Sequence, residues 1–164
     1  MSSPLPGRLD WFSAVGNFIL NYGVLDWHVL IFLESRLSPD QFSKIKNEHF
    51  QARIARVKDL VNAGDCSARQ KQDFARFFQR LDPVCELRNH IAHGHLLVRV
   101  TKDGKTPVLT LSLPKNLDSN YAPDTRHLEF SVLTSALTEL AALIEEFQKL
   151  SGGWRNETSM GDNP

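Results

Sequence analysis

The sequence has few cysteines, no excess of charge of either sign and no secretory signal pattern. Cys66 and Cys85 are its only cysteines and form no C-x-x-C pair, which favours unpaired core thiols in a reducing compartment. Nineteen lysines and arginines balance nineteen acidic residues, so any nucleic-acid site must be a local basic patch. The range 1–7 carries serine and proline rather than a basic and then an apolar run, so we expect no signal peptide.

The most apolar stretch, residues 15–33, is long enough to be considered as a membrane span. It contains Asn17, Asn21, Asp26 and His28, and each of these is costly in hydrocarbon. We therefore predict a buried helix of a cytoplasmic protein that does not enter a membrane.

The chain is 164 residues long, with 41% hydrophobic and 23% charged residues, which is typical of one soluble domain with an ordinary core. We expect disordered tails over residues 1–8 and 152–164, and a single domain over 9–151.

Apolar residues at helical spacing predict helices, and capping residues mark several of their ends. The first helix is expected over residues 9–37, where Gly16 and Gly23 indicate close approach of another helix. Ser38 and Pro39 should begin a short helix, as N-cap and first helical residue.

The next helix is predicted from about Phe50 to its end at Gly64. Ser67 and Gln70 form a capping-box pattern that opens another helix, which Pro83 should kink or restart near Asp82. The last helix is predicted over about residues 131–150, with Gly152 and Gly153 ending it.

Alternating apolar residues on either side of Asp103 and Gly104 predict a β-hairpin over about residues 96–112, followed by a loop over 114–125. The predicted fold is mainly α, an up-and-down bundle of about four to five helices with this hairpin inserted before the last helix. An isolated hairpin is marginally stable, so we expect it to lie against the bundle or a second subunit.

The stretch Leu-Arg-Asn-His-Ile-Ala-His-Gly, residues 87–94, concentrates polar chemistry at the predicted end of a helix. Asn89 and His93 are four residues apart and share a helical face. Arg88 lies on a neighbouring face, and Gly94 is expected to close the helix. Because Leu87, Ile91 and Ala92 are expected to point the other way, the polar cluster should face a cleft or a partner.

These side chains are suited to a phosphodiester. The guanidinium of Arg88 would bring its permanent positive charge and its forked N–H donors to the non-bridging phosphate oxygens. His93 titrates near neutrality, so it would take a proton from a ribose 2′-hydroxyl or give one to the leaving 5′-oxygen. Asn89 would donate to phosphate or orient the imidazole. No metal or cofactor is required. The structural alternative is a helix end at which His93 caps carbonyls and Arg88 makes a surface ion pair.

In a helical bundle, this stretch resembles the R-x4-H motif of the HEPN superfamily, whose ribonuclease members often carry Asn directly after the Arg. Arg88, Asn89 and His93 match the motif residues. The resemblance implies a homodimer with a composite cleft and metal-independent cleavage of RNA. Many family members are toxins or defence proteins with a nucleotidyltransferase or antitoxin partner. Others only bind or dimerise, which is the alternative function.

Some family toxins carry a tyrosine, modified by their partner, two residues after the motif histidine. That position is His95 here, so we do not expect this form of control.

Other clusters leave two interpretations open. One cluster is formed by histidines: His90, His93 and His95, with His28 or His49. It suggests either a metal site or, for His90, a polar group in the cleft or a dimer contact. No acidic or cysteine ligand follows at typical spacing. A basic set suggests either a track for an RNA backbone or a solvated helix face; its members are Arg53, Arg56, Lys58, Arg69, Lys71, Arg76 and Arg80.

Two further groups concern the core and the motif arginine. Phe74, Phe77 and Phe78 suggest either core or a base-stacking platform. Asp26 or Glu34 suggests either a partner for Arg88 or an ordinary surface acid.

Overall fold

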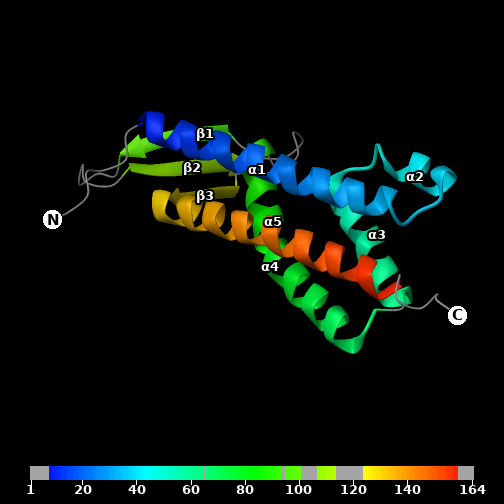
Figure 1. Ribbon diagram of the computed structural model, residues 1–164. Coiled ribbons are helices and arrows are strands. Elements are labelled where there is room, and N and C mark those ends of the chain that lie inside the picture. The colour runs from blue at the N-terminus through cyan, green and yellow to red at the C-terminus, as the bar shows by residue number, and fades with distance from the viewer. Residues whose placement is uncertain (1–7, 65, 94, 101–106, 114–123, 159–164) are drawn as a thin grey trace, which may run out of the picture. The chain divides into compact units, whose positions relative to one another are not determined.

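A computed structural model describes residues 8–64, 66–93, 95–100, 107–113 and 124–158, with the side chains of 9–64, 66–92 and 128–154. The described chain is mainly α, as predicted, with five helices and three strands (Figure 1). In chain order these are α1 (Arg8–Glu34), α2 (Pro39–Ile45), α3 (Phe50–Ala63), α4 (Ala68–His93), β1 (His95–Val100), β2 (Pro107–Leu113), β3 (Asp124–Glu129) and α5 (Phe130–Thr158).

Local capping explains where the middle helices begin and end. Ser38 and Gln41 form a reciprocal capping box at the start of α2, and Ser67 and Gln70 make the same two bonds before α4. The N-cap of α3 is His49, whose Nδ1 accepts from the Ala52 amide at 3.1 Å. These bonds satisfy amide groups that the first turn of a helix leaves without intrahelical partners.

Two predictions about the helices are wrong, and a third is wrong in part. α4 continues through Pro83, so of the predicted kink or restart the restart is wrong and the kink stays a prediction. α5 continues through Gly152 and Gly153 to Thr158, so residues 152–158 are helical rather than a tail. Gly16 and Gly23 do not mark a close helix contact, because a Cβ at either position meets nothing within 4 Å in the described part of the chain.

The strands form an antiparallel sheet in the order β1-β2-β3. β1 pairs with β2 from His95 opposite Ser112 to Val100 opposite Pro107. The prediction of two strands is corrected to three, because β3 begins inside the predicted loop and pairs with β2. The expected turn at Asp103 and Gly104 lies outside the described residues.

The chain divides into two compact units. Unit 1 comprises residues 1–21 and 83–140, and unit 2 comprises 22–82 and 141–164. The boundary in α4 falls at Pro83, the helix's internal proline. The prediction of a single domain over 9–151 stays a prediction.

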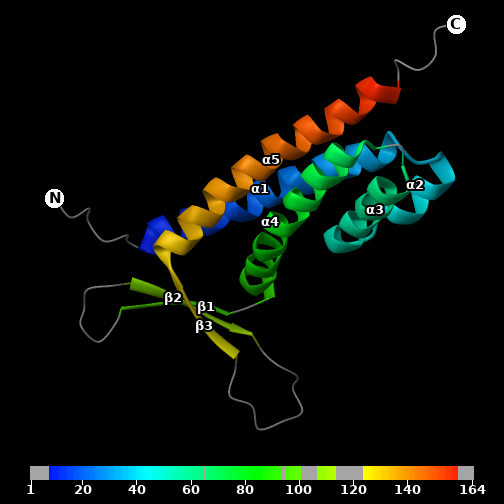
Figure 2. The same ribbon diagram turned by 90° about the horizontal axis from the view of Figure 1, so that it is seen from below.

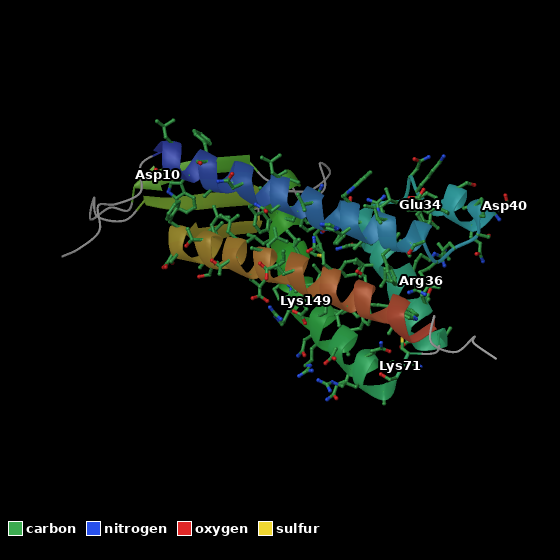
Figure 3. All side chains as sticks on the ribbon, in the orientation of Figure 1. Asp10, Glu34, Arg36, Asp40, Lys71 and Lys149 are labelled. Carbon is green, nitrogen blue, oxygen red and sulfur yellow. The ribbon has the colours of Figure 1, made fainter. Side chains whose placement is uncertain are left out.

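Unit 2 has an aromatic core. Phe147 lies 5.7 Å from Phe32 and 5.4 Å from Phe77 between ring centroids, and Trp154 lies 5.5 Å from Phe32 and 6.0 Å from Phe74. The guanidinium of Arg36, labelled in Figure 3, lies over the rings of Trp154 and Phe32 and makes cation–π contacts with them. Burial of Trp154 explains why α5 continues past its glycine pair. Phe74, Phe77 and Phe78 are all buried, so they belong to the core rather than to a base-stacking platform.

Unit 1 has a smaller described core. Trp11 and Phe130 meet edge to face with their ring centroids 5.0 Å apart. Phe18, Leu133 and Leu140 are fully buried as well. Figure 2 shows the sheet of this unit followed directly by the start of α5.

α1 contains the one segment in the described ranges, Leu9–Glu34, with the length and composition of a membrane-crossing helix; its mean hydropathy is 1.2. The same length and composition occur in core helices of soluble proteins and in signal sequences.

Two glycine substitutions should have opposite effects on stability. Gly152→Ala should raise the free energy of unfolding by about 0.5–1 kcal/mol, because the position is helical and open. Gly64→Ala should lower it by about 1–3 kcal/mol, because a Cβ there lies 2.8 Å from both the Leu60 carbonyl oxygen and the Trp154 ring. Urea denaturation measures both, and a stabilised Gly64→Ala protein would contradict this packing.

Candidate functional site

The stretch of residues 87–94 lies at the C-terminal end of α4, within unit 1. α4 ends at His93, as expected, while Gly94 and the side chain of His93 lie outside what the structure describes. The described polar side chains of this stretch are therefore those of Arg88, Asn89 and His90.

Helical geometry places the motif positions around α4. At 3.6 residues per turn, positions 89 and 93 are about 40° apart around the axis, whereas positions 88 and 93 are about 140° apart. Position 88 instead lies in line with Leu81, Val84 and Cys85, all of which are buried. The side chain of Arg88 therefore projects from the core-facing side of α4.

The apolar residues of the stretch do not all face the core. Ile91 is buried and Leu87 is half-buried, as expected, but Ala92 is exposed. The expectation is wrong for Ala92 because it occupies the last turn of α4, where the described neighbours do not cover it.

Arg88 and Asn89 contact each other. Nη1 of Arg88 donates to Oδ1 of Asn89 at 3.4 Å, and both side chains are half-buried. Because the amide oxygen accepts this bond, the amide nitrogen of Asn89 can still donate to another group. The pair thus combines a guanidinium and an amide, both of which donate hydrogen bonds to anions.

His90 is buried, with 8% of its surface exposed. Its Nδ1 lies 2.7 Å from the carbonyl oxygen of Glu86, one turn earlier. A carbonyl oxygen only accepts, so Nδ1 donates and Nε2 is the ring nitrogen left for other chemistry. The described side chains contain no group of three or more histidines, cysteines or acids placed to hold a metal, and those of His93 and His95 are outside this description.

Arg53, a member of the basic set, has a structural role in unit 2. It is 9% exposed, its Nη2 lies 2.5 Å from Oδ2 of Asp26, and its Nη1 donates to the Lys46 carbonyl at 3.2 Å. Asp26 is therefore a partner of Arg53, and the suggestion that it pairs with Arg88 is wrong. A buried forked pair of this kind fixes the start of α3 to the second half of α1.

Most other basic side chains of the set also have partners inside unit 2. Arg56 pairs with Asp59, Arg76 with Asp73 and Arg80 with Glu146. Lys58 lies over the Phe78 ring, and Lys71, labelled in Figure 3, donates from Nζ to the Asn62 carbonyl at 3.1 Å. The structure therefore favours the solvated, ion-paired face over a track for an RNA backbone.

Sequence reasoning singled out Asp26 and Arg53 but did not pair them with each other. They are 27 residues apart and on different helices, so no local spacing rule connects them. The available signal was that Asp26 is the one acid in residues 11–33, a stretch of 23 residues without lysine or arginine.

Arg53→Ala should destabilise the protein through Asp26. We expect a loss of about 3 kcal/mol in the free energy of unfolding, because the carboxylate of Asp26 would remain partly buried without its forked partner. Arg69→Ala, at an exposed position of α4, should change it by no more than about 0.5 kcal/mol. Equal stability of the two variants in urea denaturation would contradict a structural role for Arg53.

Comparison of the chain with models of protein families, with curated proteins and with solved structures finds no match. The resemblance of residues 87–94 to the HEPN motif therefore depends on those residues and on their helical setting.

Proposed function

We propose that the protein is a HEPN-like, metal-independent endoribonuclease that acts as a cytoplasmic dimer. The observation that carries the proposal is the Arg88–Asn89 pair, followed by His93, at the end of an unbroken α4 in a mainly helical chain. The proposal includes the finer fold of the family, an up-and-down bundle with the strands inserted before α5.

The proposed reaction uses the nucleophile that RNA itself carries. The 2′-oxygen attacks the adjacent phosphorus, the bond from phosphorus to the 5′-oxygen breaks, and a cyclic phosphate and a 5′-hydroxyl result. His93 transfers protons, taking one from the 2′-hydroxyl or giving one to the leaving oxygen. Arg88 and Asn89 donate to the non-bridging oxygens, where negative charge increases.

A dimer brings these groups together more easily than one chain does. Positions 88 and 93 are about 140° apart around α4, so a single helix end directs them to different sides. Two copies joined at this helix end would allow Arg88 of one copy and His93 of the other to reach one phosphate. This geometry supports the composite cleft that the resemblance implies.

The biological setting proposed is that of a toxin or defence protein with an antitoxin or nucleotidyltransferase partner. The support is the family resemblance of residues 87–94.

A second candidate is a non-catalytic module of the same fold that binds a protein or nucleotide. The observation that favours it is the pairing of Arg53, Arg76 and Arg80 with carboxylates, which leaves less positive charge to hold an RNA strand.

Cleavage of single-stranded RNA in EDTA tests the enzymatic proposal. His93→Ala should reduce the cleavage rate by about 100-fold or more, the usual contribution of a general acid or base. Arg88→Lys should also reduce it, because an ammonium keeps the charge but loses the fork. His28→Ala is the matched control, since His28 is bonded to Gln148 in unit 2, away from the motif in sequence.

Equal rates for the wild type and the His93→Ala protein, or no cleavage by either, would overturn the enzymatic proposal. A folded protein that binds RNA without cleaving it would support the second candidate.

A further inference from the structure

His90 is a titratable residue of the motif stretch that has no role in the reaction proposed above. Its imidazole is 8% exposed, and its Nδ1 lies 2.7 Å from the carbonyl oxygen of Glu86. Because that oxygen only accepts, Nδ1 carries the ring proton of the neutral imidazole and Nε2 keeps a lone pair. Enzymes orient a histidine for proton transfer in this way, with a fixed group holding the other ring nitrogen.

The other histidines with described side chains are bonded in the opposite sense. Nδ1 of His49 accepts from the Ala52 amide at 3.1 Å, so the lone pair of that ring is already used. Nε2 of His28 lies 2.8 Å from Nε2 of Gln148, an amide nitrogen that only donates, so its lone pair is used as well. Among the described histidine side chains, His90 is the one whose hydrogen bond leaves a ring lone pair for another group.

The surroundings of His90 suit a base. Nε2 has no hydrogen-bond partner among the described residues, and it is not one of their fully enclosed polar atoms, so solvent reaches it. The burial of the rest of the ring and the bond from Nδ1 hold the imidazole in one orientation. A fixed orientation lowers the cost of bringing a catalytic group and its substrate together.

Position 90 is placed to act together with position 93. The two positions are three residues apart on α4, about 60° apart around the axis and about 4.5 Å apart along it. Side chains at this spacing are neighbours, with Cβ atoms about 5–6 Å apart. Glu86 lies on the same face but is about 10 Å along the axis from position 93, which is about two turns. His90 is therefore the titratable residue of α4 within one turn of His93.

The proposed cleavage requires two proton transfers. One proton leaves the 2′-hydroxyl as its oxygen attacks phosphorus, and another joins the 5′-oxygen as its bond to phosphorus breaks. The attacking and leaving oxygens lie on opposite sides of phosphorus in an in-line displacement. One imidazole nitrogen holds either a proton or a lone pair, so a single histidine cannot serve both oxygens at the same moment. Two histidines on one face of a helix supply one group for each oxygen.

We propose that His90 is the general base of this site. Its Nε2 accepts the proton of the ribose 2′-hydroxyl while His93 donates a proton to the leaving 5′-oxygen. The 2′-oxygen bonds to phosphorus, the bond from phosphorus to the 5′-oxygen breaks, and a cyclic phosphate and a 5′-hydroxyl form. His90 ends the step as an imidazolium and His93 as a neutral imidazole, and proton exchange with water restores both. The inference rests on the proposed ribonuclease function and assigns its two proton transfers to two residues.

His90→Asn separates a base from a structural residue. Its amide nitrogen takes the place of Nδ1 and keeps a donor for the Glu86 carbonyl, but the side chain has no basic nitrogen. Cleavage of single-stranded RNA in EDTA should slow by about 100-fold or more, the usual contribution of a general base. His28→Asn is the matched control and should cleave at the wild-type rate, since His28 lies in unit 2 and bonds to Gln148. Circular dichroism checks that both variants are folded.

A changed leaving group separates the base from the acid. When sulfur replaces the 5′-oxygen at the cleavage site, the leaving thiolate needs no proton, because a thiol is a much stronger acid than an alcohol. On this substrate His93→Ala should recover most of the wild-type rate, whereas His90→Asn should stay slow. Recovery by His90→Asn but not by His93→Ala would overturn the assignment, because His90 would then be the acid.

The wild-type protein allows a test that needs neither a folded variant nor activity. In the ¹⁵N NMR spectrum of the neutral His90 imidazole, Nδ1 should be protonated and Nε2 should not. A protonated Nε2 would overturn the proposal, because that nitrogen would have no lone pair for the 2′-hydroxyl.

The cleavage assay also distinguishes this inference from the proposed function. If the wild type cleaves RNA, His93→Ala does not and His90→Asn cleaves as fast as the wild type, the inference fails and the proposed function stands. A wild type that cleaves no RNA would overturn both.

Discussion

The burial of one face of α1 is the constraint on which both compact units depend. Trp11 and Phe18 belong to the core of unit 1, and Leu25, Val29 and Leu33 belong to that of unit 2. Fully burying each of these side chains contributes about 1.5–3 kcal/mol relative to leaving it exposed. A helix that supplies core residues to both units must be apolar along its whole length. That requirement accounts for the buried face of α1 but not for the exposed large hydrophobic residues that the same helix carries.

Much of the helical structure could be predicted from the sequence because it depends on local chemistry. The capping boxes at Ser38 and Ser67 each involve residues three apart, and their bonds form wherever a helix begins there. The sequence was misleading where distant packing overrides local propensity. Gly152 and Gly153 disfavour a helix, but the burial of Trp154 against Phe32 and Phe74 stabilises one. β3 was missed because its sequence, Asp-Thr-Arg-His-Leu-Glu, lacks apolar alternation and gains its strand structure from pairing with β2.

The position of the candidate site could be predicted, but its surroundings could not. The spacing of Arg88, Asn89 and His93 gives their arrangement on a helix as soon as α4 is known to be unbroken. Spacing did not show that the Arg88 position lies on the core-facing side of α4, since that depends on which face of the helix the core covers. It also did not show that Arg53 is buried with Asp26, since that pair joins two helices.

The pairing of three arginines with carboxylates restricts how the proposed nuclease would hold RNA. The strength and salt dependence of binding increase with the number of phosphates that lysine and arginine neutralise. Arg53, Arg76 and Arg80 each contact a carboxylate, so replacing that partner by a phosphate would leave an acid unpaired. These three arginines of unit 2 are therefore poorly available to an RNA strand, and the proposed site relies on the motif stretch for its contacts to phosphate. The proposed composite cleft suits this arrangement, because a second copy doubles the number of motif residues.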